Sequence, residues 1–425
     1  MNDLSQRPAP VRTDEERLEA ARASVRADLT RRAALHLEAC IHCGRCAEAC
    51  PFFLATGDAR YTPALKLEPL RRMVRAERLV APFGRRADSL SLADLEAWQP
   101  LVYDSCTMCG RCTLACPMAI DVAALVSIAR RALFAADLAP PDLAAVAERA
   151  HREGSPLGVT PQVLRERLAW IADEHEVGIA LDAARADVLL TLSSIEVMKY
   201  PESVAAMARV LQRVGIPWTV STRGYEATNF GMLAGAAAWQ RDATRRLVEA
   251  AKACGAQVVL VPECGHAYSA LRWQGAAMAG APLPFRVLHI AEYIAEHLAT
   301  GRLRVRHADG SATFHDPCQI SRRGGATAAP RAVMAALGLE PRDPEASGDL
   351  GFCCGGGGGV SANRRADPLR YATTAIRLRQ LGAPAADRVL TSCANCRQTF
   401  DDAQAHDAGG PKVGSLVELV AKSLE

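Results

Sequence analysis

Hydrophobic and polar positions divide the 425-residue chain into a helical front part and a rear part in which strands and helices alternate. Helical spacing of apolar residues predicts helices over residues 14–35, 65–79, 90–98 and 122–138. The pair Pro140 and Pro141 interrupts this pattern. A connector rich in Ala, Arg and Glu, also predicted to be helical, then continues to about residue 184.

From residue 186 the pattern changes to short apolar runs that alternate with helical segments. Strands are predicted at 187–192, 217–221, 257–261, 312–315 and 388–391, and helices at 201–214, 237–254 and 330–337. Pro201 and Gly215 flank the first of these helices as helix ends require. The alternation indicates α/β layers with parallel sheets in two related halves.

Composition and charge narrow the class of protein. Apolar residues make up 49% of the chain, enough for sizeable cores, and the net charge is only +3. No basic stretch is interleaved with aromatic residues, so a nucleic-acid partner is not expected. The first thirty residues are polar and rich in Arg and Glu, and they lack the apolar segment of a signal peptide. No apolar run in the chain approaches the ~18 residues of a membrane span. A cytoplasmic protein is expected.

The 15 cysteines carry the strongest chemical signal. Two runs share the pattern CxxCxxCxxxCP, at residues 40–51 and 106–117. In the two-cluster ferredoxin run, the first three thiolates bind one [4Fe–4S] cluster and the fourth binds the other. One cluster is therefore assigned to Cys40, Cys43, Cys46 and Cys116, and the second to Cys106, Cys109, Cys112 and Cys50. Zinc is the alternative metal, since CxxC pairs also bind it.

A second group of cysteines surrounds Gly351–Gly359, where adjacent Cys353 and Cys354 are followed by five glycines. Glycine is tolerated where the backbone turns sharply or approaches a ligand closely. Cys318 lies 35 positions before Cys353, and a CxxC pair follows 39 positions after Cys354. One metal site is predicted, with the ligands Cys318, Cys353, Cys354, Cys393 and Cys396. The alternative is a buried set of inert cysteines.

The two rear halves match in spacing but differ in ligands. Gly224–Ala227 occupies the place of Gly351–Cys354, and 259–266 parallels 389–396. In the first half only Cys254 and Cys264 remain, too few for a cluster. Its strand-end residues are predicted either to line a pocket beside the other half's site or to be ordinary structural residues; they are Glu263, Cys264 and His266.

These motifs together resemble the heterodisulfide-reductase type of iron–sulfur protein. The similarity covers about residues 30–425, and stretches such as 57–63, 66–72, 224–231 and 262–267 are most similar to the catalytic subunit of membrane-associated redox complexes found with dissimilatory sulfite reductase. The resemblance implies a noncubane [4Fe–4S] centre on the five rear cysteines, where a disulfide is cleaved. Because the first half lacks a full ligand set, one such centre is expected, and a sulfur substrate other than the coenzyme heterodisulfide.

The predicted fold is a multi-domain α+β protein, in which an α-helical ferredoxin-like domain with two clusters precedes a two-half α/β cysteine-rich (CCG) domain. Its expected parts are a polar N-terminal extension (1–30), the two-cluster domain (31–140), a helical connector (141–185), a first half without ligands (186–300) and a second half with the noncubane site (301–425).

The predicted function is electron relay through two [4Fe–4S] clusters to the CCG centre, which reduces or forms a disulfide- or trisulfide-type substrate. His315 and His266 are candidate proton donors, with a structural role as the alternative. Expected partners are a membrane cytochrome b-type protein or a flavoprotein, and a small sulfur-carrier protein; through such a partner the chain would sit at the inner face of the cytoplasmic membrane. The rival function is an electron-transfer subunit of a flavin-dependent dehydrogenase for lactate, glycolate or glycerol 3-phosphate.

Overall fold

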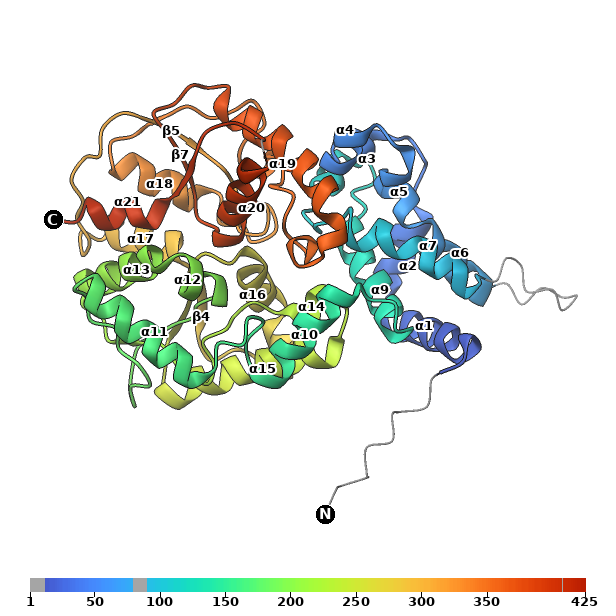
Figure 1. Ribbon diagram of the computed structural model, residues 1–425, viewed down its shortest axis with the longest axis horizontal. Helices are drawn as coiled ribbons and strands as arrows, with labels where there is room; N and C mark the ends of the chain where they lie inside the picture. The colour runs from blue at the N-terminus through green and yellow to red at the C-terminus, as the bar shows by residue number, and fades with distance from the viewer. Residues whose placement is uncertain (1–11, 79–89, 407) are drawn as a thin grey trace, which may run out of the picture.

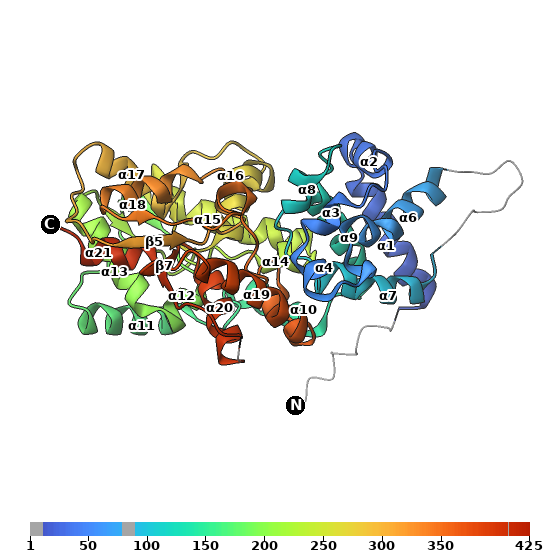
Figure 2. The same ribbon diagram turned by 90° about the horizontal axis from the view of Figure 1, so that it is seen from above.

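The computed structural model describes residues 12–78, 90–406 and 408–425. The N-terminal helices gather at one end of the molecule and the two sheet-containing halves form the other end (Figures 1 and 2). Within the described ranges, no helix combines the length and apolar character that crossing a bilayer requires.

The N-terminal domain is entirely helical in the part of the chain that the structure describes. Its helices are α1 Asp14–Asp28, α2 Arg31–Glu38, α3 Arg45–Glu48, α4 Pro51–Thr56, α5 Pro63–Lys66, α6 Glu68–Arg78, α7 Leu92–Tyr103, α8 Arg111–Ala115 and α9 Val122–Ala135, with a 3₁₀ turn η1 at Ala59–Tyr61. The central helix is α9, which buries one apolar side against α1 and α7.

Two predicted helices differ from those observed. The helix expected over 14–35 is divided at Leu29 and Thr30, because the Thr30 side chain accepts a hydrogen bond from the backbone of Ala33 and so caps α2 as a new helix. The helix expected over 65–79 is divided at Leu67 into α5 and α6. Pro69 has no N–H for a continuous helix at this point. Residue 79 lies outside the described residues.

Helix α1 belongs to the packed body of the N-terminal domain, although all of its residues fall in the stretch expected as a polar extension. Ala21 and Val25 are buried against the neighbouring helices. The Arg17 side chain donates to the carbonyl of Ala136, just after α9. The polar side of α1 faces solvent, which explains why its composition suggested an extension.

The connector and the first half follow. The connector contains α10 Pro141–Glu153 and α11 Pro161–Glu174. The first half contains β1 Val188–Leu190, α12 Ser194–Lys199, α13 Pro201–Val214, β2 Trp218–Thr219, α14 Phe230–Ala234, α15 Ala237–Cys254, β3 Val258–Val261, α16 Gly265–Ala279, β4 Arg286–His289 and α17 Ile290–Ala299. Its four strands are parallel, in the order β2-β1-β3-β4.

The second half repeats this sheet. It contains β5 Ser311–Phe314, α18 Ala328–Ala336, β6 Glu340–Pro341, α19 Asp367–Gly382, β7 Arg388–Thr391, α20 Ala394–Ala405, β8 Val413–Ser415 and α21 Leu416–Lys422, with 3₁₀ turns η2 Gly348–Leu350, η3 Val360–Ala362 and η4 Arg364–Ala366. The strands are again parallel, in the equivalent order β6-β5-β7-β8. The expectation of parallel sheets in two related halves agrees with this topology.

The halves share a continuous core and bring corresponding strand ends together. One apolar cluster includes Leu190 and Leu260 of the first sheet with Phe314 and Leu390 of the second. Residues two or three positions past the ends of β1, β3, β5 and β7 line a single cavity between the halves; the first of them are Ser193, Glu263, Pro317 and Cys393. The carboxyl ends of parallel strands are the usual place for a binding site in α/β sheets.

Candidate metal centres

The two CxxCxxCxxxCP runs form matching turns. In each, a residue with positive φ precedes the second cysteine, His42 at 53° and Met108 at 55°. A left-handed glycine then begins the following short helix, Gly44 before α3 and Gly110 before α8. The repeated backbone explains how cysteines three positions apart can face one point.

The fourth cysteine of each run lies with the first three of the other. One small cavity is lined by Cys40, Cys43, Cys46 and Cys116, and a second by Cys50, Cys106, Cys109 and Cys112. These are the two groups that the sequence predicted by crossover. Four thiols converging on each cavity suit a [4Fe–4S] cluster, which is held by four thiolates.

The two cavities differ in their surroundings. The first reaches the surface, where Cys43 is exposed. In the second, Cys50 is buried, and the side chain of Lys66, 1% exposed, places its ammonium 3.7 Å from the Cys50 sulfur. Burying an ammonium beside thiols is favourable when they are ionised as metal ligands, because a buried charge needs a partner. Lys66 is a residue that the sequence analysis missed.

The five rear cysteines line one cavity of about 290 Å³ and are all buried; they are Cys318, Cys353, Cys354, Cys393 and Cys396. The sulfurs of Cys318 and Cys353 are 3.9 Å apart, and the backbone N–H of Gly355 points at the Cys353 sulfur from 3.4 Å. Five thiols around one hollow fit a multi-iron sulfur cluster better than a single tetrahedral ion, which takes four ligands.

The glycines after Cys354 are required by close packing. A Cβ on Gly356 would lie 1.9 Å from the Thr399 hydroxyl oxygen. Gly358 has φ +65°, and a Cβ there would lie 2.8 Å from the backbone of Thr107. The glycine turn is therefore pressed against α20 on one side and against the second ferredoxin-type run on the other.

The second thiol cavity and the rear site are direct neighbours. The Thr107 hydroxyl, inside the second run, lies 3.2 Å from the Cys353 sulfur. Gln319, next to Cys318, donates to the carbonyl of Met108 at 2.8 Å, and Arg322 donates to that of Cys109 at 3.0 Å. These contacts between distant parts of the sequence fix the second cavity against the rear site.

One buried arginine holds all three parts together. Arg130 on α9 donates hydrogen bonds to the carbonyls of four residues from the N-terminal domain, the first half and the glycine turn: Val102, Cys106, Leu233 and Gly358. Its side chain is fully buried. The sequence carried a signal for it, because helical spacing places Arg130 on the apolar side of α9 with Val126 and Leu133.

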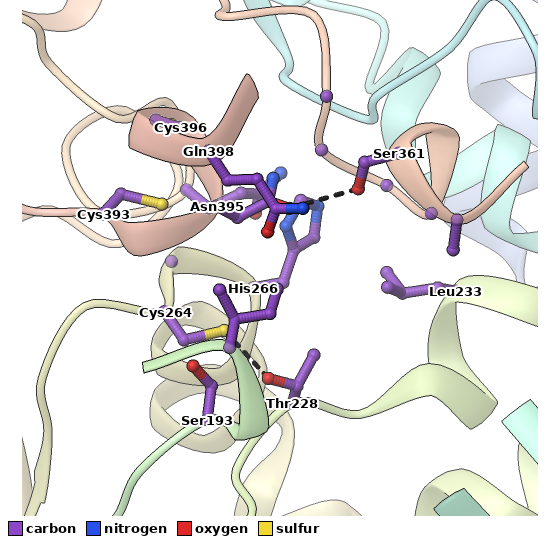
Figure 3. Close-up of a pocket in the computed structure, with 18 of the residues that line it drawn as sticks. Ser193, Thr228, Leu233, Cys264, His266, Ser361, Cys393, Asn395, Cys396 and Gln398 are labelled. Atoms are coloured by element: carbon purple, nitrogen blue, oxygen red, sulfur yellow. Dashed lines mark hydrogen bonds between the residues drawn. The ribbon is translucent and has the colours of Figure 1, made fainter. Parts of the chain in front are cut away.

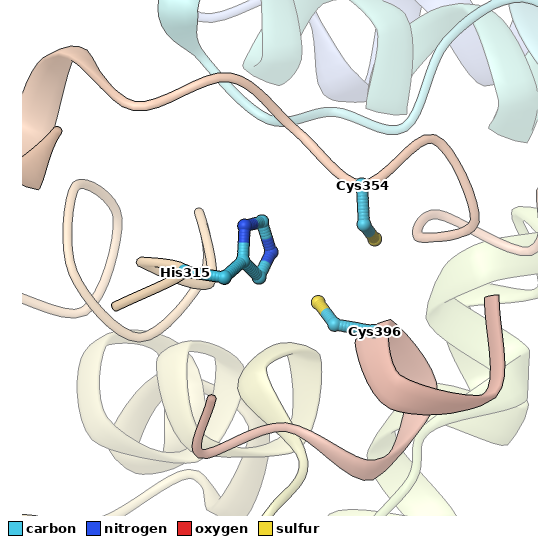
Figure 4. Close-up of side chains that lie close together, drawn as sticks. All are labelled: His315, Cys354 and Cys396. Carbon is cyan, nitrogen blue, oxygen red and sulfur yellow. The ribbon is translucent and has the colours of Figure 1, made fainter. Parts of the chain in front are cut away.

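His315 lies behind the cysteines and does not line the cavity. One of its ring nitrogens and the sulfurs of Cys354 and Cys396 lie within 4.8 Å of one another (Figure 4). The Arg377 Nε–H donates to its Nδ1 at 3.2 Å, so the neutral ring carries its proton on Nε2. Burial and the nearby Arg377 charge hold the pKa of His315 well below its usual value.

The first half supplies the facing wall of the cavity (Figure 3). Cys264 and His266 line it, and the Cys264 sulfur lies 3.4 Å from the Thr228 hydroxyl. Burial lowers the pKa of His266 to about 4 and raises that of Cys264 to about 12, so both are uncharged near neutrality. Glu263 also lines the cavity, whereas Cys254 packs in the core away from it.

Comparisons with known proteins agree with this division. Residues 36–120 match the 4Fe-4S dicluster domain family, and residues 312–401 match the cysteine-rich domain family named CCG.

Three relatives span nearly the whole chain. One component of the dihydromethanophenazine:CoB–CoM heterodisulfide reductase of Methanosarcina barkeri is 24% identical, over 92% of this chain and 94% of its own length. The "Hdr-like menaquinol oxidoreductase iron-sulfur subunit 2" of Archaeoglobus fulgidus is 26% identical, over 92% and 80%. The "Probable membrane-anchored ferredoxin" of Chromohalobacter salexigens is 28% identical over 94% of this chain, but the chain spans only 61% of that relative.

The predicted resemblance is therefore confirmed: the chain carries a dicluster domain and a CCG domain, and over nearly its whole length it is similar to heterodisulfide-reductase-type iron–sulfur proteins. The finer similarity to the subunit found with dissimilatory sulfite reductase stays a prediction.

Proposed function

We propose that this heterodisulfide-reductase-like protein passes electrons one at a time through two [4Fe–4S] clusters to a third, noncubane centre, which reduces or forms a disulfide- or trisulfide-type sulfur bond. The single observation that carries the proposal is the contact between the Thr107 hydroxyl and the Cys353 sulfur. It joins the second ferredoxin-type run to a cysteine-lined cavity large enough for a substrate.

The geometry gives the relay a direction. The cavity of Cys40, Cys43, Cys46 and Cys116 reaches the surface, so it is the site that a redox partner can approach. The cavity of Cys50, Cys106, Cys109 and Cys112 lies between that surface and the rear site. Three centres in series can collect the two electrons that cleavage of one sulfur–sulfur bond requires.

The cavity beside the five cysteines supports a small sulfur substrate. Its first-half wall is apolar at Ile195, Met198 and Phe230, while Asn395 and Gln398 supply amides beside the cysteines. When bound, an iron–sulfur centre supplies electrons and a Lewis-acidic iron for a substrate sulfur. The Nε2–H of His315 has no hydrogen-bond partner among the described residues, and a ring nitrogen of His315 lies within 4.8 Å of the sulfurs of Cys354 and Cys396.

The partners follow from the same arrangement. Electrons would be exchanged at the surface cluster with a membrane cytochrome b-type protein or a flavoprotein, and sulfur could be presented by a small carrier protein. The names of two relatives, a membrane-anchored ferredoxin and a menaquinol oxidoreductase subunit, support a place at the cytoplasmic membrane through such a partner. The substrate would then be that of a sulfite-reductase-associated complex.

The alternative function is an electron-transfer subunit of a flavin-dependent dehydrogenase, and the relative described as a ferredoxin favours it. In that case the rear centre would only relay electrons. The lining of the cavity extends past the five cysteines to Ile195, Met198 and Phe230, which carry no metal-ligand atom, and this extension favours a substrate site over a pure relay.

The test is Cys354→Ala, compared with the matched control Cys254→Ala. Both cysteines are buried, and the small volume change of either substitution is expected to lower stability by about 1 kcal/mol. Only Cys354 lines the cavity. Cys354→Ala should abolish reduction of a disulfide while dithionite still reduces the two N-terminal clusters, and Cys254→Ala should keep both activities. Full disulfide turnover in Cys354→Ala would contradict the proposed function and favour the electron-transfer alternative.

A further inference from the structure

The first half has kept the geometry of the metal site while exchanging its ligands. Strand registers make the correspondence: Val188 pairs with Val258 as Ala312 pairs with Arg388. Ser194 lies as far along the chain after Val188 as Cys318 lies after Ala312, so the two residues occupy equivalent positions. The alignment of Gly224–Ala227 with Gly351–Cys354 places Glu226 in the position of Cys353.

Ser194 and Glu226 touch, as their counterparts do. The Cys318 and Cys353 sulfurs are 3.9 Å apart. In the first half, the Ser194 hydroxyl donates to Glu226 Oε2 at 2.5 Å and its backbone N–H donates to the same oxygen at 2.8 Å. The backbone N–H of Thr228 donates to the other carboxyl oxygen at 2.8 Å. A metal-binding pair has been replaced by a hydroxyl–carboxyl pair.

This pair connects two cavities. Ser194 lines the 290 Å³ cavity that the five cysteines also line. Glu226 lines a separate cavity of about 220 Å³, and Thr228 lines both. The exposed side chains of Arg152 and Arg223 stand around the second cavity, which places it at the surface. The hydroxyl–carboxyl pair therefore spans the wall between the sulfur site and a water-accessible hollow.

Burial makes the Glu226 carboxyl group easier to protonate than an exposed one. Burial raises the pKa of Glu226, opposed by its hydrogen bonds to Ser194 and Thr228. Glu196 on α12 is also buried, and burial raises its pKa to about 7. Tyr225 lines the outer cavity, and its hydroxyl lies 3.4 Å from the Ser194 hydroxyl. The other charged or titratable groups around the outer cavity are His151, Arg152 and Glu153 of α10, Arg223, and Arg246 of α15.

We propose that Ser194 and Glu226 form a proton-delivery site for the sulfur substrate, a role that rests on the proposed function. The reaction to be balanced is R–S–S–R′ + 2 e⁻ + 2 H⁺ → R–SH + R′–SH, with both electrons from the reduced iron–sulfur clusters of the chain. As the sulfur–sulfur bond breaks, the protonated Glu226 carboxyl gives its proton to the Ser194 oxygen while the Ser194 hydroxyl gives its own proton to the leaving R′–S⁻, so no serine alkoxide forms. Water in the outer cavity then reprotonates Glu226. The second proton goes to R–S⁻ in the same way after a second transfer.

The experiment compares two disulfides whose leaving groups differ in their need for a proton. Clusters of the intact protein are reduced with titanium(III) citrate, and their reoxidation is followed by absorbance in a stopped-flow instrument. The first probe is bis(2-hydroxyethyl) disulfide, whose leaving group is a basic alkyl thiolate. The second is 5,5′-dithiobis(2-nitrobenzoate), whose leaving group is an aryl thiolate that is stable without a proton. The variants are Glu226→Gln and Ser194→Ala, with Glu249→Gln on the exposed side of α15 as the control.

Loss of proton delivery slows the alkyl disulfide selectively. Glu226→Gln and Ser194→Ala should each slow it by about 10²-fold and leave the aryl disulfide nearly unchanged, since general acid catalysis contributes at least that factor. Glu249→Gln should match wild type with both probes. A purely structural role of Glu226 would slow both disulfides equally, and that result overturns the proton-delivery site while leaving the proposed function intact. If wild type reduces neither probe, both proposals are wrong.

A second measurement does not depend on turnover. In infrared spectra of the cluster-containing protein, the carbonyl band of a protonated carboxylic acid should be present in wild type and weaker in Glu226→Gln. The same band should be unchanged in Glu249→Gln, whose carboxylate is exposed. Identical carboxyl bands in wild type and Glu226→Gln across the pH range of activity would show that Glu226 never holds a proton and would overturn the assignment.

Discussion

Replacing Arg130 with methionine tests whether the relay depends on one buried contact between the three parts of the chain. The guanidinium donates to four backbone carbonyls, at 2.5 to 3.0 Å, and its side chain is fully buried. Methionine has similar length and no donor, so the change removes the hydrogen bonds with little change in volume. The carbonyl of Gly358 would lose this partner directly beside the rear site.

The expected loss of stability is about 3–5 kcal/mol. Each buried acceptor left without a partner costs about 1–3 kcal/mol, so four acceptors treated as independent give a larger total. Two effects reduce that total. The variant avoids the cost of burying the guanidinium charge, and the losses of hydrogen bonds that belong to one network are not additive. The remaining value is typical of breaking a buried charged network.

The assay is anaerobic thermal unfolding of the cluster-loaded protein, with Arg131→Met as the matched control. Arg131 is the next residue on α9, is partly exposed and pairs with Asp28 at 2.5 Å. Such an ion pair contributes about 0–1 kcal/mol. Arg130→Met should also slow electron transfer from the N-terminal clusters to the rear centre, because the glycine turn loses its attachment. Equal unfolding temperatures for the two variants would refute the reasoning.

Three further predictions address the clusters themselves. Protein purified without oxygen should contain about twelve irons, four for each of three clusters. A count near eight would contradict the presence of the third cluster. Cys50→Ser should damage the cluster of Cys106, Cys109 and Cys112, as EPR of the reduced protein would show, whereas damage confined to the cluster of Cys40, Cys43 and Cys46 would contradict the crossover. Gly358→Ala should destabilise the protein and slow electron transfer to the rear centre, because φ is +65° and the new Cβ would lie 2.8 Å from the Thr107 backbone; Gly255→Ala, at φ +73° with open space around its Cβ, is the control that isolates the backbone strain.

Many helices and strands of the fold could be predicted from local sequence patterns. The helices 201–214 and 237–254 and the strand 388–391 begin and end where the sequence predicted. Each has a strong local signal, such as Pro201 and Gly215 at the helix ends. Strands β4, β6 and β8 were not predicted, because two to four residues at the edge of a sheet carry little pattern of their own.

The sequence by itself determined which cysteines lie together, because the spacing of the CxxC runs and of the adjacent Cys353 and Cys354 follows the geometry that shared metal ligation needs more than it follows the fold. Only the tertiary structure decided how the sites are arranged. The contact of Thr107 with Cys353 and the hydrogen bond of Arg130 to Gly358 each join residues more than 200 positions apart. The pairing of Ser194 with Glu226 depends on the register of a parallel sheet. No local pattern encodes such contacts, since they form only when separate elements pack.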